Sequence, residues 1–409
     1  MDSKIAAKSS LPLLFLIMNL FMACSRDQAI QGFSEEDGFD PKDRGKVSEK
    51  VFTDLEIEET FRDTVLATGL SPSLQLGRFK GVEASILLKF KDVPDTLTIM
   101  SACIALRTRG FIGEDAKSSF VATMHPVNED WSQLDVSSAN FQNSFEATPI
   151  ASAAILTRSS NPDSSTETVR FFLNQRGIAL VQEWADTTSG NNYGVLIQAD
   201  PLQSLFVKEF NSINDPNNAP RPTLELEVLR DAELDTLIFG ASEDAYLVET
   251  FEEPPASRLY VDNVLNRHSV IKFNLSDLPR GSTINRAELI LTLDTENSII
   301  SETGFFIQLI RLKKEFESAE TFSLELPATV VSQDVVPIIT RDTPIVKISV
   351  RNVLQGWVSE DFENHGLLLR SATPGLDVGR LAFPSSEADS TASVRIDVDF
   401  STSQAIPQN

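Results

Sequence analysis

The sequence predicts an all-β protein, with two tandem antiparallel β-sandwich domains of the jelly-roll-like type after a signal peptide and a short tether. Three observations predict this fold class. Apolar and polar residues alternate in many short segments, which is the spacing of a strand with one buried face. Clusters of turn-forming residues separate these segments, and sustained helical periodicity is rare. The same succession of features also occurs twice along the chain.

Residues 1–23 have the features of a lipoprotein signal peptide. Lys4 and Lys8 supply a positive region, and the apolar stretch 11–22 is shorter than the ~20 residues that a spanning helix needs. The stretch ends in Phe21-Met22-Ala23-Cys24, which resembles the bacterial lipobox, although Phe21 stands where leucine is usual. We therefore expect Cys24 to carry a diacylglycerol and a fatty acid such as palmitate, which together anchor the chain to a membrane. The alternative is an ordinary cleaved signal peptide with an incidental cysteine.

The residues after Cys24 predict where the protein is held. Ser25, rather than an aspartate, follows the cysteine, as in lipoproteins sent on to an outer membrane. Residues 24–50 are polar and charged with few aliphatic side chains, which is typical of a flexible tether. We expect a lipid-anchored protein of the cell envelope, and the sequence leaves open which side of the outer membrane it faces.

Composition limits the partners and the number of domains. At 409 residues the chain exceeds what one hydrophobic core usually serves, so two domains are expected. A formal charge of -24 and a pI near 4.5 disfavour nucleic acid as a partner, because phosphates would be repelled. If Cys24 is lipidated, Cys103 is left as the second cysteine of the chain, and no disulfide forms within the mature protein.

The internal repeat divides the chain into a first domain at 51–230, a second at 231–402 and a tail at 403–409. Ile99 and Ile284 are 185 residues apart, whereas Gly194 and Gly366 are 172 apart, so the first half carries an insertion. We place it within 140–168, a stretch rich in serine, alanine and threonine that is expected to form a surface loop. Short helical turns are expected at 178–184 and 353–357, where apolar residues lie three or four apart. Strand patterns occur, in chain order, at 85–90, 103–107, 194–197, 223–228, 269–273, 288–292, 366–369 and 393–398.

Several of these segments resemble the DNRLRE domain family, a carbohydrate-binding-module-like family of secreted bacterial proteins. In the second half the similar segments are 244–247, 257–261, 270–279 (VIKFNLSDLP), 287–289 and 366–370; in the first half they are 63–66, 89–90, 127–131 and 194–197, with Trp184. The family's arginine before its core strand is replaced by Ser85 and Ser269. The resemblance implies the β-sandwich fold. It also implies binding of a polysaccharide, since some relatives bind alginate.

Few residues have the chemistry of a ligand site. Trp131 stands beside acidic and polar neighbours and is the aromatic residue expected to be exposed, although its counterpart Phe316 hints at packing. Trp184 and Trp357 occupy equivalent positions in apolar surroundings and are expected in the cores. Arg107 and Arg109 share one strand face, and with Arg78 and Lys80 they form a candidate anion-binding patch confined to the first half.

No catalytic or metal site is predicted. His125, His268 and His365 fall at unrelated places in the repeat, and no catalytic motif or phosphate-binding glycine loop occurs. Cys103 lies on an expected strand and is interpreted as a buried thiol. We expect no cofactor. The loops at 161–163 and 214–215 have oxygen ligands suited to a structural Ca²⁺, but they lack a spaced ligand set.

The sequence thus predicts a non-catalytic envelope lipoprotein that binds an extracellular polysaccharide. The alternative is a structural or protein-interaction lipoprotein whose partner is an envelope protein bound at an exposed strand edge. A hydrolase is the third hypothesis, because abundant carboxylates place some pair near any cleft.

Overall fold

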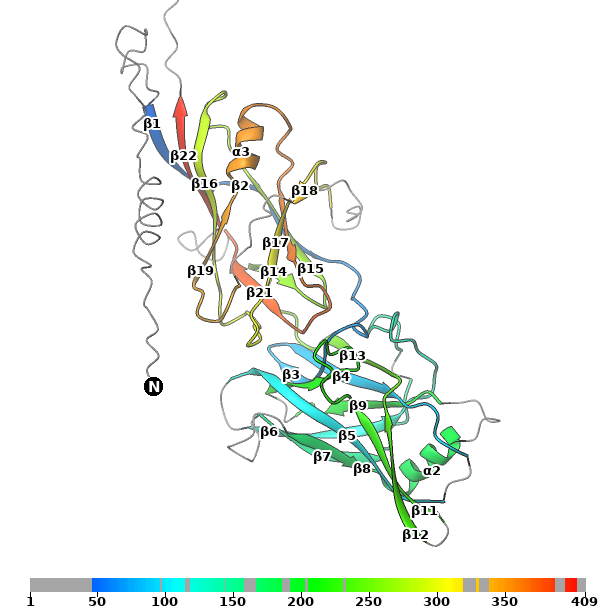
Figure 1. Cartoon of the computed structure of the whole chain (residues 1–409). Coiled ribbons are helices and arrows are strands. Elements are labelled where there is room, and N and C mark those ends of the chain that lie inside the picture. Colours follow the sequence, from blue (N-terminus) through cyan, green and yellow to red (C-terminus); the bar gives the residue numbers. More distant parts are fainter. Residues whose placement is uncertain are drawn as a thin grey trace, which may run out of the picture. The chain divides into compact units, whose positions relative to one another are not determined.

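The computed structural model describes residues 46–402, apart from 96–97, 115–117, 143, 158–166, 186–191, 203–204, 231–232, 319–328, 331–337 and 387–393. The chain is all-β, with antiparallel strands and two helices in the described part, α2 (Gln175–Ala185) and α3 (Arg351–Val358) (Figure 1). Neither helix has the length and apolar character required to cross a membrane. The strands are β1 (Lys46–Phe52), β2 (Leu55–Arg62), β3 (Ser73–Phe79), β4 (Val82–Lys89), β5 (Thr98–Gly113), β6 (Ser119–Pro126), β7 (Ala151–Leu156), β8 (Thr168–Phe172), β9 (Val195–Ala199), β10 (Phe206–Asn211), β11 (Thr223–Arg230), β12 (Glu233–Gly240), β13 (Glu243–Thr250), β14 (Arg258–Asp262), β15 (Arg267–Phe273), β16 (Thr283–Thr292), β17 (Ile307–Arg311), β18 (Thr329–Val330), β19 (Ile345–Ser349), β20 (Leu367–Ser371), β21 (Arg380–Pro384) and β22 (Arg395–Thr402).

Corresponding strands of the two repeats have corresponding neighbours. One group forms a single eleven-stranded sheet, in which β10 also pairs with β5 and β3 with β4, whereas the other group forms separate sheets of four, two and five strands. The order β12-β11-β5-β8 matches β1-β22-β16-β19, and β7-β6-β9-β4-β13 matches β18-β17-β20-β15-β2. The pair β3-β10 likewise matches β14-β21. Each strand from β1 to β11 therefore has its counterpart eleven strands later, so the repeat in the sequence is also a repeat in the structure.

The first two strands of each repeat are exchanged between the two strand sets. β12 and β13 belong to the second half of the sequence but pair with β11 and β4 of the first half. Conversely, β2 pairs with β15 and β1 with β22 (Figure 1). We call β3–β13 the first set, and β14–β22 together with β1 and β2 the second set. The predicted boundary after residue 230 marks where the repeat restarts, but the strand pairing does not divide there.

Each set encloses a large hydrophobic core. The core of the first set, the first core, includes Leu76 on β3, Ile104 on β5 and Leu224 on β11, all fully buried. The second core includes Ile271 on β15, Leu289 on β16 and Ile396 on β22. The alternating pattern that predicted strands therefore has its apolar residues on the buried face, as expected for sheets with one side packed.

Two expectations about local structure were wrong and one is confirmed. β1 begins at Lys46 inside the predicted tether, because an edge strand can keep charged side chains in water while its backbone pairs. The segment 140–168 contains β7, which pairs with β6 and buries Ile155, so it is not only a surface loop. The helical turns expected before the two tryptophans are confirmed by α2 and α3.

Candidate functional site

Trp131 is buried, so the exposed position predicted for it was wrong. The residue is 7% exposed and packs with Leu87 and Leu196 in a small apolar cluster. Its indole N–H donates to the carbonyl of Tyr193 at 2.8 Å, and the Nζ of Lys89 lies 4.6 Å from the ring centroid. The ring face is thus already occupied by a protein cation.

The basic residues predicted to form an anion patch each contact a different partner. Arg78 pairs with Glu83 and lies over the ring of Phe251. Arg107 donates to the hydroxyl of Thr168 at 3.3 Å, and Arg109 pairs with Asp215 at 2.6 Å. The Nζ of Lys80 donates to the carbonyls of Thr295 and Ser298, both at 2.9 Å. These contacts do not gather the four cations around one site.

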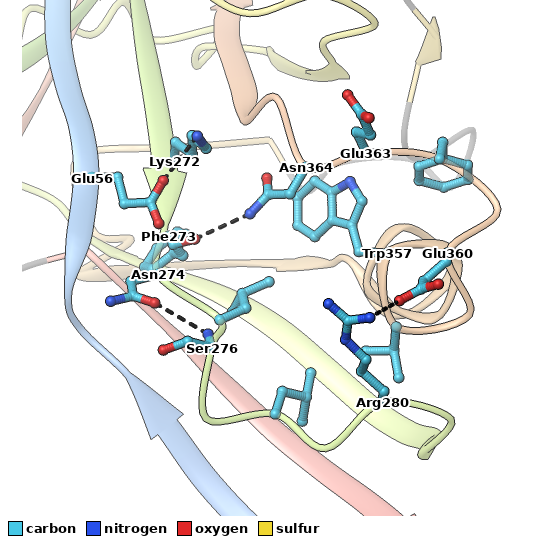
Figure 2. A pocket seen from close by; sticks show the side chains of 14 residues that line it. Glu56, Lys272, Phe273, Asn274, Ser276, Arg280, Trp357, Glu360, Glu363 and Asn364 are labelled. Atoms are coloured by element: carbon cyan, nitrogen blue, oxygen red, sulfur yellow. Dashed lines mark hydrogen bonds and ion pairs between the residues drawn. The ribbon is translucent and has the colours of Figure 1, made fainter.

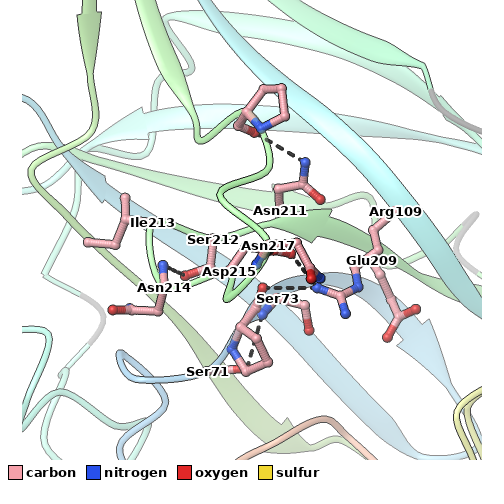
Figure 3. Close-up of polar contacts among 12 residues, drawn as sticks. Ser71, Ser73, Arg109, Glu209, Asn211, Ser212, Ile213, Asn214, Asp215 and Asn217 are labelled. Atoms are coloured by element: carbon pink, nitrogen blue, oxygen red, sulfur yellow. Dashed lines mark hydrogen bonds and ion pairs between the residues drawn. The ribbon is translucent and has the colours of Figure 1, made fainter.

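Protein groups contact both carboxylate oxygens of Asp215 in its loop (Figure 3). One oxygen of Asp215 accepts from Arg109, and the other accepts from the backbone N–H of Asn217 at 2.8 Å. Arg109 also donates to the carbonyl of Pro72 at 3.3 Å. Within the described ranges no group of three or more His, Cys, Asp or Glu residues is arranged to hold a metal ion. The other predicted calcium loop, 161–163, lies outside the described residues, as does Cys24.

A groove of about 780 Å³ lies beside α3 in the second set, within the size range of small-molecule sites (Figure 2). Its walls are the end of β15 with the turn that follows, and the end of α3 with the turn that follows. Glu56 of β2 completes one side. The lining residues are Glu56, Lys272, Phe273, Asn274, Leu275, Ser276, Leu278, Arg280, Trp357, Val358, Glu360, Phe362, Glu363 and Asn364.

Trp357 gives the groove an aromatic wall. The residue is only partly buried against the second core, which corrects the expectation that it lies within the core. Its indole nitrogen is itself buried, so the accessible surface of the indole consists of ring carbon. Phe362 lines the same groove, and the guanidinium carbon of Arg311 lies 3.9 Å from the centroid of its ring.

Polar groups surround this aromatic wall, and most are already oriented by the protein. Asn364 donates to the carbonyl of Phe273 at 3.1 Å, and the side-chain oxygen of Asn274 accepts from the backbone N–H of Ser276 at 3.1 Å. The Nζ of Lys272 pairs with Glu56 at 2.8 Å, and Arg280 pairs with Glu360 at 2.6 Å. Fixed amides and carboxylates beside an aromatic face are the groups that recognise hydroxyl-rich ligands.

The aromatic wall of the groove has a buried counterpart in the described part of the first set. Trp184 is the counterpart of Trp357 and is 8% exposed, with its ring stacked on Phe90 at 6.3 Å. Asn192 donates to the carbonyl of Phe90, as Asn364 does to that of Phe273, so the two places share their framework. The repeat led us to treat both tryptophans alike. The missed signal was the run of carboxylates at 360, 361 and 363, which marks a solvent-facing turn directly after Trp357.

The three histidines and Cys103 are held by packing, burial or contacts with other protein groups. His125 is held by Thr123 and by the carbonyl of Glu146, each at 2.9 Å. Burial lowers the pKa of His268 to about 4, and its ring packs edge-on against Phe61. His365 is partly exposed and lies 3.4 Å from Glu363. Cys103 is buried and free, and burial raises the pKa of its thiol to about 11, far from that of a reactive thiolate.

No protein-family model matches the chain, and comparison with the curated proteins finds no match.

Proposed function

We propose that the chain is a non-catalytic lipoprotein of the cell envelope, with two β-sandwich modules, that binds an extracellular polysaccharide in the groove beside Trp357. The groove carries the proposal, because an accessible carbon face next to oriented amides and carboxylates suits a sugar ring with its hydroxyl groups. The DNRLRE-like segments support the same function, and the proposed modules correspond to the first and second sets.

The cellular address is part of the proposal. The signal sequence and Cys24 support a lipid anchor, and the absence of an aspartate after Cys24 supports the outer membrane. Mass spectrometry of the mature N-terminus tests it: a diacylglyceryl group on Cys24 is expected, and an unmodified N-terminus would remove the anchor from the proposal.

Binding is tested by affinity electrophoresis of the chain without residues 1–24 through gels that contain plant, algal or bacterial polysaccharides. We expect retardation by at least one polysaccharide, and loss of most of it in Trp357→Ala. Phe172→Ala is the matched control, because Phe172 is a 70% exposed aromatic residue on β8, outside the groove. If no polysaccharide retards the chain, or if both variants behave alike, the groove is not a glycan site.

A protein-interaction function is the second candidate, because β12 is the last strand at one end of its sheet and is largely exposed. Leu234 and Ile238 on β12 are 69% and 64% exposed, and Leu229 on β11 lies opposite Leu234. An exposed apolar strand at a sheet edge can accept a further strand from a partner. Crosslinking in intact cells should capture one envelope protein through this edge if this candidate is correct, and Ile238→Lys should abolish the capture.

A further inference from the structure

We infer that the groove beside Trp357 selects neutral sugars over uronates and sulfated sugars, and that each chain has one such site. The inference rests on the proposed glycan binding and adds the ligand's charge and the stoichiometry. It follows from how the charged groups of the groove are paired.

Carboxylates outnumber cations among the residues that line the groove. Three carboxylates line it, those of Glu56, Glu360 and Glu363, against the two cations Lys272 and Arg280. Lys272 pairs with Glu56 at 2.8 Å and also lies 3.9 Å from Glu315. Arg280 pairs with Glu360 at 2.6 Å. Glu315 and Arg311, which lies over the ring of Phe362, add one charge of each sign beside the groove, so the excess of carboxylates remains. An incoming carboxylate or sulfate would compete with the carboxylates already paired with Lys272 and Arg280 and would face this excess of like charge.

The same groups suit a neutral, hydroxyl-rich ring. Carboxylates accept hydrogen bonds only, and sugar hydroxyls can donate to them. Glu363 is the most available acceptor, since its side chain is 87% exposed. Each asparagine amide also keeps further hydrogen-bonding capacity: Asn364 uses its nitrogen on Phe273 and its oxygen on the N–H of Gly366 at 3.1 Å, and both atoms can make a second bond. The carbon face of Trp357 would then take the apolar face of the ring.

One site per chain is expected because the described counterparts of Trp357 and Lys272 in the first set are buried. Trp184 is buried and stacked on Phe90. Lys89, the counterpart of Lys272, is only 4% exposed and is enclosed by Asp130 and Trp131. Its ammonium is therefore already bound by protein groups, the carboxylate of Asp130 and the carbonyl of Trp131.

The test is isothermal titration of the chain from Ser25 with neutral oligosaccharides (β-glucan, mannan and xylan series) and with anionic ones (oligoalginate, oligogalacturonate and a sulfated galactan series), with and without 2 mM Ca²⁺. We expect one neutral series to bind with a stoichiometry of one, with at least tenfold weaker binding in Trp357→Ala. Anionic series should bind at least tenfold more weakly than the best neutral one. Trp357→Phe, which keeps an aromatic ring in place, should retain partial binding if Trp357→Ala fails to fold.

Charge selection is tested separately with Glu360→Gln/Glu363→Gln. The double variant should gain several-fold in affinity for an anionic series, because it frees Arg280 and removes repulsion. The matched control Glu233→Gln/Glu296→Gln makes the same change in net charge at exposed positions outside the groove and should show no gain.

The outcomes separate this inference from the proposed function. If an anionic series binds best and depends on Trp357, with or without calcium, glycan binding stands and the neutral selection is overturned. A stoichiometry of two overturns the single site. If neither class of oligosaccharide binds, the proposed glycan function itself fails.

Discussion

The carboxyl group of Asp244 at the start of β13 is fully buried, and burial raises its pKa from 3.8 to about 6. It accepts hydrogen bonds from the hydroxyl of Ser212 at 3.0 Å and from the N–H of Ile213 at 2.8 Å, which only partly offset the burial. Because the folded protein binds this proton more tightly than the unfolded chain, the free energy of unfolding should fall as the pH rises from about 4 to about 6 and then stay reduced.

Asp244→Asn should therefore stabilise the protein above pH 6, by about 3 kcal/mol at most, since each pKa unit corresponds to about 1.4 kcal/mol. The neutral amide can still accept from Ile213, and its NH₂ can donate to the hydroxyl of Ser212. The measurement is urea unfolding of both proteins at pH 4, 5, 6 and 8. Other buried acids such as Asp377 also titrate, so the quantity compared is the difference between the two proteins. A difference that does not grow between pH 4 and 6 would contradict this account.

Gly194 has no room for a side chain. Its φ is +78°, and a Cβ there would lie 2.0 Å from the carbonyl oxygen of Leu88, a backbone atom that cannot move without disturbing β4. Gly281 is a suitable control, because its φ is +72° and a Cβ there would meet no atom within 4 Å. Gly281→Ala should lower the free energy of unfolding by about 1–2 kcal/mol, because alanine disfavours the left-handed conformation. Gly194→Ala should cost clearly more in urea unfolding; equal effects would show that the close contact is not rigid.

Residue types predicted the core better than the ligand site. Whether an aromatic side chain is buried depends on which loop covers it, and the neighbouring residues in the sequence do not predict this. Polar residues around Trp131 suggested exposure, yet Lys89 and Asp130 form a 2.6 Å ion pair beside the ring. Apolar neighbours around Trp357 suggested burial, yet the turn after α3 leaves part of its ring open to the groove.

At the scale of elements, α3 shapes the groove through a residue with no side chain. Gly356 is buried in the helix, and a Cβ there would lie 2.1 Å from the Cζ of Phe362, which lines the groove. The helix itself would accept alanine, which is favoured over glycine by about 1 kcal/mol in helix interiors. The glycine is therefore required by the ring of Phe362 and not by the backbone.

A double-mutant cycle in urea tests this explanation. Gly356→Ala should destabilise the protein by about 1–2 kcal/mol, because the displaced ring overpacks its surroundings. In a Phe362→Ala background the same change should be neutral or stabilising by up to about 1 kcal/mol. The same cost in both backgrounds would mean that Phe362 is not what limits position 356.

The elements themselves were largely predictable, since alternation and helical spacing reflect burial by neighbours close in sequence. Both helices and the strands of the repeat lie where the pattern placed them. β1 and β7 were missed for different reasons. Burial alternates along β1, but its valines lie on the exposed face, with Val47 63% and Val51 54% exposed, and the more buried face carries Ser48 and Lys50, so the sequence does not show an apolar face. β7 is rich in alanine, which has little preference for strands, and it is held by pairing with β6.

At the scale of the whole molecule, the exchange of strands could not follow from the repeat alone. Alternation shows which face of β12 is apolar but not which strand it pairs with, and counterparts in the two repeats have the same pattern. Connection length favours the pairing of β12 with β11, because only residues 231–232 separate them and a two-residue connection commonly joins antiparallel neighbours. It does not decide the pairing of β13, because residues 241–242 separate β12 from β13, yet β13 pairs with β4 and not with β12. Because β12 and β13 pair within the first set, β1 and β2 take the corresponding edge positions in the second set, beside β22 and β15.

This exchange predicts that cutting the chain between the repeats will not separate them. A protease site placed at residues 231–232 would divide the chain into two fragments, each containing two strands that complete the other fragment's sheets. After cleavage we expect the fragments to elute together in gel filtration at native pH and to separate only in denaturant. If the exchange is correct, separating the fragments would pull the four exchanged strands out of their sheets and expose core residues such as Tyr246 on β13. Fragments that elute apart as two folded species would therefore show that each repeat completes its own sheets.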